Sequence, residues 1–104
     1  MASGILGKAD LAATTYTTIY TVPTGGLTTV NISTCNRNTL GVKIRLALAA
    51  ATGTPADSEF IEYDTVLPAN GVIERTGVVI GSDVKITAYS DTADVTVVAY
   101  GMEG

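Results

Sequence analysis

More than a third of the chain consists of residues branched at the β-carbon. Of its 104 residues, 17 are Thr, 11 are Val and 8 are Ile, which makes 36 in total. Two heavy atoms on Cβ restrict the first side-chain torsion, which disfavours helix and suits a residue to a pleated sheet. The apolar fraction is 46% and the charged fraction only 15%, which excludes an intrinsically disordered chain. The composition therefore predicts an all-β protein with a core of its own.

Apolar and polar residues alternate along several short segments. The pattern is plainest over residues 40–48, where Ile44 and Leu46 alternate with Lys43 and Arg45. Such alternation is typical of an antiparallel strand with one buried face. Turn-forming Gly, Pro, Asn and Asp residues separate the segments at spacings of about 8–14 residues. We expect strands over residues 14–22, 27–35, 40–48, 58–64, 72–76 with 78–80, 84–89 and 95–100.

Evenly spaced short strands predict an antiparallel β-sandwich or jelly roll of about seven to eight strands. A chain of this length has room for one such domain, which we assign to residues 14–104. Ten aliphatic side chains are expected to be buried between the two sheets: Val30, Ile32, Val42, Ile44, Leu46, Leu48, Val84, Ile86, Val95 and Val97.

Residues 1–13 lack this alternation and are interpreted as an N-terminal arm. They carry the aliphatic side chains of Ile5, Leu6 and Leu11 together with two glycines and two charges. Leaving such side chains in water costs about 1.5–3 kcal/mol each relative to full burial. We therefore expect Ile5, Leu6 and Leu11 to bind a partner, either another copy or a larger assembly. The alternative is that the arm folds back and caps an open edge of its own sandwich.

The chain offers little for catalysis or metal binding. It contains no His, and the neighbours of its single Cys35 are small and polar, so we interpret this cysteine as a packed residue. No G-x-S-x-G sequence is present to activate a serine. The chain is therefore expected to be no enzyme, to use no cofactor, and to have no catalytic, cofactor-binding or metal-binding residues.

The densest acidic group consists of Asp57, Glu59, Glu62 and Asp64. Calcium sites draw several oxygens from one loop, whereas these residues lie along a predicted strand. With a two-residue period, Glu62 and Asp64 share one face and Asp57 and Glu59 the other, unless a bulge intervenes. We expect ordinary exposed carboxylates. A carbohydrate site would need a concave surface lined by aromatic rings, and five Tyr scattered over the chain do not indicate one.

Charge and hydropathy indicate whether the chain binds nucleic acid or enters a membrane. A net charge of −4 without a basic run is unfavourable for nucleic-acid binding. No apolar run approaches the roughly 20 residues needed to cross a bilayer. Lys8 and Asp10 interrupt the region where a secretory signal needs unbroken apolar residues. We expect neither nucleic acid nor membrane as a partner, and synthesis in a cytoplasm.

Six short stretches within residues 16–101 carry a resemblance when they are taken together. They read YTVP (20–23), NISTCNR (31–37), IEYD (61–64), LPANG (67–71), ERTG (74–77) and VAYG (98–101). In this order and spacing they resemble a group of small virion proteins of tailed bacteriophages. The resemblance implies a non-enzymatic virion structural protein, foremost a head decoration (cement) protein that stabilises the capsid.

The same resemblance implies partners and a location. The partners are the major capsid protein or other virion proteins, together with further copies of the chain as a homo-oligomer, with a trimer among the expected states. The location is the virion, assembled in the host cytoplasm. Two alternatives stay open: a tail, baseplate or fibre-attachment component, and a carbohydrate- or surface-binding β-module outside this group.

Overall fold

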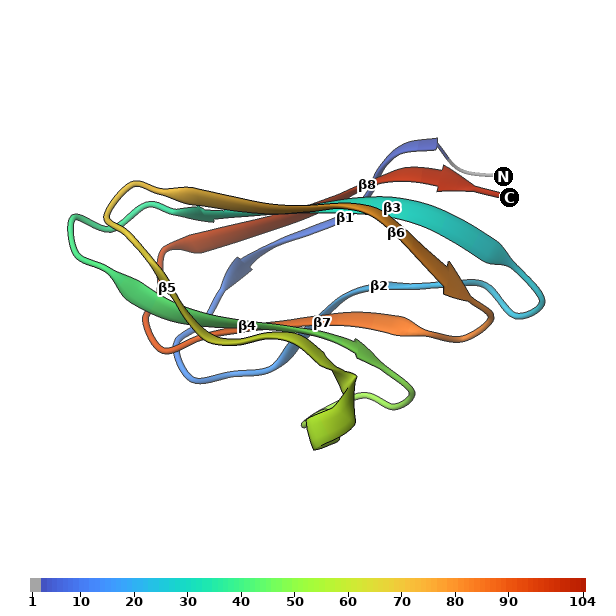
Figure 1. The fold of residues 1–104 in the computed structure, drawn as a ribbon, viewed down its shortest axis with the longest axis horizontal. Coiled ribbons are helices and arrows are strands. Elements are labelled where there is room, and N and C mark those ends of the chain that lie inside the picture. The colour runs from blue at the N-terminus through green and yellow to red at the C-terminus, as the bar shows by residue number, and fades with distance from the viewer. Residues whose placement is uncertain (1–2) are drawn as a thin grey trace.

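The described part of the chain, residues 3–104 of a computed structural model, forms eight strands (Figure 1). Two antiparallel four-stranded sheets result, with strand order β1-β8-β3-β6 in sheet A and β2-β7-β4-β5 in sheet B. In chain order the elements are β1 (Ser3–Leu11), β2 (Thr17–Thr21), β3 (Leu27–Asn36), β4 (Val42–Ala49), the 3-10 turn η1 (Asp57–Glu59), β5 (Phe60–Leu67), β6 (Val72–Gly81), β7 (Lys85–Ser90) and β8 (Val95–Glu103).

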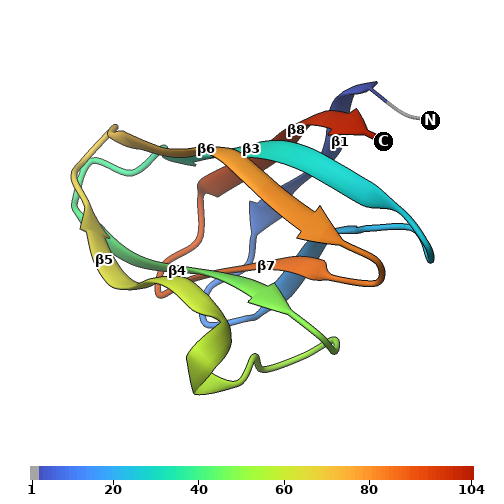
Figure 2. The ribbon, with the colours of Figure 1, turned by 45° about the vertical axis from the view of Figure 1, so that its right-hand side comes forward.

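The chain crosses repeatedly from one sheet to the other. Among the eight strands, β4 and β5 are the one pair adjacent both in sequence and in a sheet. Figure 2 shows the two layers, with β6, β3, β8 and β1 facing β5, β4, β7 and β2. This order is that of a jelly roll. The all-β sandwich predicted from alternation and turn spacing is confirmed.

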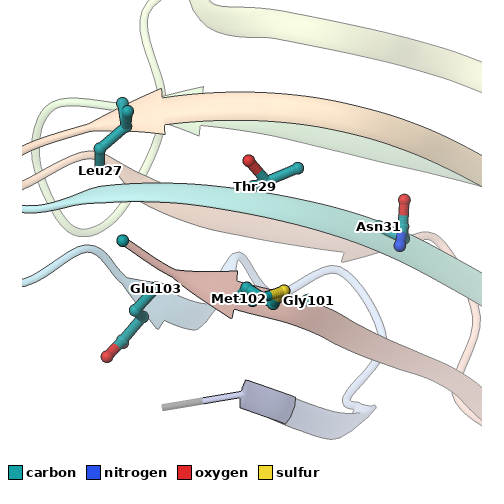
Figure 3. A pocket seen from close by; sticks show the side chains of 7 residues that line it. Leu27, Thr29, Asn31, Gly101, Met102 and Glu103 are labelled. Atoms are coloured by element: carbon teal, nitrogen blue, oxygen red, sulfur yellow. The ribbon is translucent and has the colours of Figure 1, made fainter. Parts of the chain in front are cut away.

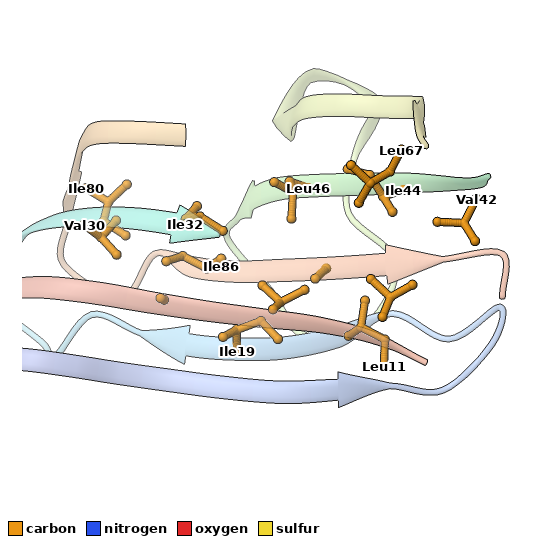
Figure 4. Packing of buried hydrophobic residues seen from close by; sticks show 14 of the residues in the cluster. Leu11, Ile19, Val30, Ile32, Val42, Ile44, Leu46, Leu67, Ile80 and Ile86 are labelled. Atoms are coloured by element: carbon orange, nitrogen blue, oxygen red, sulfur yellow. The ribbon is translucent and has the colours of Figure 1, made fainter. Parts of the chain in front are cut away.

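The core fills the space between the sheets (Figure 4). Of the ten aliphatic side chains expected there, eight are buried, and Leu48 and Val84 are half-buried against them. Lys43 is exposed and Arg45 lies on the outer side, so the predicted register of β4 is confirmed. The core also takes in residues that were not expected there: Leu11, Ile19, Val22, Leu67, Ile80, Ala88 and Ala99.

Residues 3–11 do not form a separate arm, so that part of the expectation is wrong. They make strand β1, which pairs antiparallel with β8 from Ser3 opposite Met102 to Leu11 opposite Val95. A bulge at Leu6 shifts the register and hides the two-residue period in the sequence. The alternative, an N-terminal segment that caps an edge of its own sandwich, is what the structure contains. Residues 1 and 2 lie outside the described residues.

Strand β1 also closes one side of the sandwich. It passes so near β2 that a Cβ on Gly7 would collide with the carbonyl oxygen of Ile19. On the opposite side, the Arg75 guanidinium of β6 makes an ion pair across the gap with the Glu62 carboxylate of β5. A close backbone approach that only glycine allows therefore closes one side, and a charge pair bridges the other.

Asn36, at the end of β3, ties two turns together at one end of the sandwich. Its side chain is fully buried, and Nδ2 donates to the carbonyl oxygens of Leu40, Leu67 and Pro68 at 2.9–3.1 Å. Its Oδ1 accepts from the backbone N–H of Asn38 at 2.9 Å. One buried amide thus donates to backbone carbonyl groups of both the β3–β4 and the β5–β6 connections and joins them.

Candidate functional site

The outer face of sheet A carries exposed apolar side chains from all four of its strands. Ile5 of β1, Leu27 of β3, Val79 of β6 and Met102 of β8 are each more than half exposed. The register places Thr29 between Met102 and Val79 in one row across the sheet. Leu27 and Ile5 lie in the rows on either side of it. We call the four residues with Thr29 the apolar end of sheet A.

A shallow groove runs along this end between β3 and β8 (Figure 3). Leu27, Thr29 and Asn31 line it from β3, and Gly101, Met102 and Glu103 line it from β8. The Glu103 carboxylate accepts from the Tyr20 hydroxyl at 2.5 Å, on the inner side of the sheet. The charged residues that point outward, Lys8, Asp10 and Glu74, lie toward the other end of the face. The apolar end of sheet A is therefore an uncharged surface.

The outer face of sheet B is of a different kind. Four of the six aromatic residues in the chain, Tyr16, Phe60, Tyr63 and Tyr89, gather there around Arg45. The Arg45 guanidinium lies 4.2 Å from the ring centroid of Tyr63 and 4.7 Å from that of Tyr89. Contacts of this kind are cation–π interactions, worth about 0.5–2 kcal/mol each. We call these five residues the aromatic cluster.

A β-bulge in β5 makes the aromatic cluster possible. Between the pairs Ile44–Thr65 and Leu46–Glu62, β5 contains one residue more than β4. Asp64, at this bulge, has a left-handed backbone with φ of 51°. Consecutive residues of a regular strand point to opposite faces, but here both Tyr63 and Asp64 reach Arg45. Strained backbone of this kind is frequent where a side chain must be aimed.

A second bulge, in β2, supplies Tyr16. The sequence pattern places Tyr16 and Tyr20 on one face, but the extra residue at Ile19 reverses their relation. Tyr20 packs against the core, whereas Tyr16 lies on the outer side with its ring 4.7 Å from that of Tyr89. The expectation that the tyrosines are scattered over the fold is therefore wrong for three of the five.

Arg45 is held from several directions. Its Nε donates to Asp64 Oδ1 at 2.7 Å, and its Nη1 donates to the Tyr16 hydroxyl at 2.7 Å. These bonds raise the pKa of Arg45, and the bond from Arg45 lowers the pKa of Asp64. The guanidinium remains charged, its charge is balanced by Asp64, and it serves as a fixed centre on which the rings are placed.

A small open pocket lies beside the aromatic cluster, lined by Asp57, Phe60 and Tyr63. The Phe60 and Tyr63 rings meet nearly at right angles, with centroids 4.9 Å apart and an interplanar angle of 81°. The loop before η1 is fixed by Glu59, whose carboxylate accepts from the backbone N–H groups of Ala50 and Ala56 at 2.9 Å. The pocket therefore has two aromatic walls and one acidic side.

The four acidic residues singled out from the sequence are not one exposed group. Glu62 is only 7% exposed and faces inward, where it accepts from the Thr65 hydroxyl at 2.7 Å and pairs with Arg75. Asp64 points outward to Arg45, because the extra residue of the bulge turns it to the opposite face from Glu62. Among residues 3–104, no group of three or more His, Cys, Asp or Glu side chains could hold a metal ion.

The expected partner-binding residues of the N-terminal segment have different environments. Leu11 is 2% exposed and belongs to the core, so it is not free to bind a partner. Leu6 is half-buried against the core, and Ile5 alone is exposed, within the apolar end of sheet A. Cys35 is half-buried in β3 and is not in a disulfide. No helix within the described residues is long and apolar enough to cross a membrane.

Comparison with solved structures shows a weak likeness. A chain from Bacillus endospore appendages, described as a novel family of disulfide-linked pili, has a TM-score of 0.46 and 13% sequence identity, over 97% of this chain and 92% of that one. No protein-family model matches the sequence, and no curated protein matches it. The bacteriophage resemblance thus rests on the sequence stretches alone.

Proposed function

We propose that this chain is a non-enzymatic structural protein of a tailed-phage virion that decorates the head, attached to the major capsid protein through the outer face of sheet A. The observation that carries the proposal is the apolar end of sheet A. Val79 and Met102 are 61% and 66% exposed there, without an outward-pointing charged side chain among them. Contiguous apolar surface on a soluble protein is typical of a protein–protein contact.

The size of the face fits attachment to a large particle. The sheets are stacked along the vertical direction of Figure 1, so each outer face spans about 40 by 19 Å, roughly 760 Å². One partner in a standard protein interface contributes about 800 Å². A head decoration protein needs one contact of this size per copy. The six sequence stretches that resemble virion proteins supply the identity of the partner, and self-association into a homo-oligomer is part of the same proposal.

Quantitative mass spectrometry of purified virions tests this role. The test variant combines Val79→Lys with Met102→Lys, which places two charges on the apolar end of sheet A. The matched control combines Thr18→Lys with Thr21→Lys, which places the same charges on exposed positions of sheet B. We expect the wild-type and control chains in many copies per particle, and a loss of more than tenfold for the test variant.

The outcomes separate the alternatives. Enrichment in the tail fraction, after heads and tails are separated, would replace head decoration by a tail or baseplate role. Equal incorporation of test variant and control would show that sheet A is not the attachment face. Absence of the wild-type chain from purified virions would contradict the virion role altogether.

A further inference from the structure

We propose that the corner formed by Asp57, Phe60 and Tyr63, on the outer side of sheet B, binds a neutral pyranose sugar of a glycan. The inference does not depend on the virion role, because it rests on a different face of the molecule. It concerns the pocket beside the aromatic cluster.

The shape of the corner suits a sugar ring. The Phe60 and Tyr63 rings stand at 81° to each other with centroids 4.9 Å apart, and Tyr63 is 57% exposed. One face of a pyranose carries mainly C–H groups, which pack against an aromatic ring, while its rim carries hydroxyls. A binding site for such a molecule combines an apolar wall with a few polar groups at the edge.

The polar groups at this corner are free to bind hydroxyls. Within residues 3–104, neither the Asp57 carboxylate nor the Tyr63 hydroxyl makes a hydrogen bond or an ion pair with another residue. The carboxylate offers two acceptor oxygens, and the phenol offers one donor and one acceptor. Together they can satisfy neighbouring hydroxyls of a sugar whose C–H face lies on a ring.

The corner is rigid before any ligand arrives. Arg45 supports Tyr63 from one side at 4.2 Å, and Asp64 holds Arg45 at 2.7 Å. Glu59 fixes the chain on the other side of the pocket through two backbone N–H groups. Preorganisation of this kind lowers the ordering cost of binding, which matters for a ligand with few contacts.

Charged ligands fit the corner less well than neutral ones. The Asp57 carboxylate opposes an anion such as a phosphate or a sialic acid. A cation at Tyr63 would share that ring with the Arg45 guanidinium, which lies 4.2 Å from the ring centroid. A neutral sugar meets neither penalty, so the observations favour it over a quaternary ammonium.

Saturation-transfer NMR with the wild-type protein tests the site. The probes are methyl β-glucoside, methyl β-galactoside, methyl α-mannoside and methyl β-N-acetylglucosaminide, with choline as the cationic probe and sialic acid as the anionic one. We expect at least one neutral glycoside to bind in the millimolar range, with saturation concentrated on the C–H protons of one ring face. Its binding should perturb the aromatic signals of Phe60 and Tyr63.

Variants assign the binding to the corner. Tyr63→Ala should weaken binding at least tenfold, Asp57→Asn severalfold, and Tyr63→Phe less than Tyr63→Ala, because it removes the hydroxyl but keeps the ring. Tyr100→Ala is the matched control, since this tyrosine lies on the outer side of sheet A. Circular dichroism establishes that each variant is folded. Binding of choline alone, binding unaffected by Tyr63→Ala, or no binding of any neutral glycoside would overturn the proposal.

Discussion

The outer faces of the two sheets are built by different means from the same chain. On sheet A, β3 and β8 run in unbroken register, so Leu27 and Met102 follow from simple alternation, whereas register shifts in β1 and β6 turn Ile5 and Val79 to the same face. On sheet B, bulges in β2 and β5 bring Tyr16, Tyr63 and Asp64 to Arg45. The comparison teaches that a regular central pair of strands can form the middle of a flat apolar surface. Bulges are needed where neighbouring residues must converge on one side chain.

Removing a core residue between the two faces should have the largest effect, because both depend on it. Leu46 is 1% exposed and belongs to the core, on the inner side of the strand that carries Arg45. Leu46→Ala should lower the free energy of unfolding by about 2–5 kcal/mol. Urea denaturation measures the loss. Leu40→Ala is the matched control, since Leu40 is exposed, and an equal loss in both variants would contradict the assigned core.

Asn36 joins the sheets at one end, and its removal should rank next. Asn36→Ala removes the Nδ2 donor from the carbonyl oxygens of Leu40, Leu67 and Pro68, of which the Pro68 oxygen keeps its bond from the Gly71 N–H. The expected loss is about 3 kcal/mol, from the lost hydrogen bonds to the buried Leu67 oxygen and the part-buried Leu40 and Pro68 oxygens. Asn36→Asp keeps the shape but removes the donor, so it should be no more stable than Asn36→Ala. A stability of Asn36→Asp close to that of the wild type would exclude these hydrogen bonds as the cause.

Replacing Arg45 should disturb one face and leave the other intact. Arg45→Met keeps the length of the side chain but removes two hydrogen bonds and two cation–π contacts. We expect a loss of about 1–2 kcal/mol and a weaker near-ultraviolet circular dichroism signal from the tyrosines. Lys43→Met, at an exposed position of the same strand, is the control. NMR shifts spread over sheet A to the same extent as over sheet B would contradict a local effect.

The smallest effect concerns pH and is confined to sheet B. The pKa of Asp64 is lowered in the folded state by the hydrogen bond from Arg45. The stability that it contributes is therefore present above the ordinary pKa of Asp, about 3.9, and is lost as the pH falls through the lower folded value. The melting temperatures of Asp64→Asn and wild type should differ at neutral pH and converge in acid. A difference that does not depend on pH would rule out the charge as its source.

The sequence predicts the parts of this fold that are regular. Alternation in β4 places Ile44 and Leu46 in the core, and the turn residues give the strand spacing of a sandwich. Strand β1 was not predicted as a strand because Gly4, Gly7 and the bulge at Leu6 break its period. The alternation of apolar and polar residues does not show which residue of a strand a bulge leaves unpaired.

The same limit explains why the aromatic cluster was missed. Its members are separated by up to 73 positions, from Tyr16 to Tyr89, and only the strand order of sheet B brings them together. The burial of Glu62 was also missed, because its contact with Arg75 joins two different sheets. Arg45, between Lys43 and Ala47 on the predicted outer face of its strand, was the local signal that the sequence offered.

Hydroxyl-radical footprinting, resolved by mass spectrometry, tests most directly whether the two faces have separate roles. In the free protein, Met102 and Tyr63 are both more than half exposed, so both should be oxidised. In intact virions, we expect Met102 to be strongly protected and Tyr63 to react as in the free protein. Protection of Tyr63 with Met102 still reactive, or equal reactivity of both in the two states, would contradict the assignment of sheet A to attachment and sheet B to the outside.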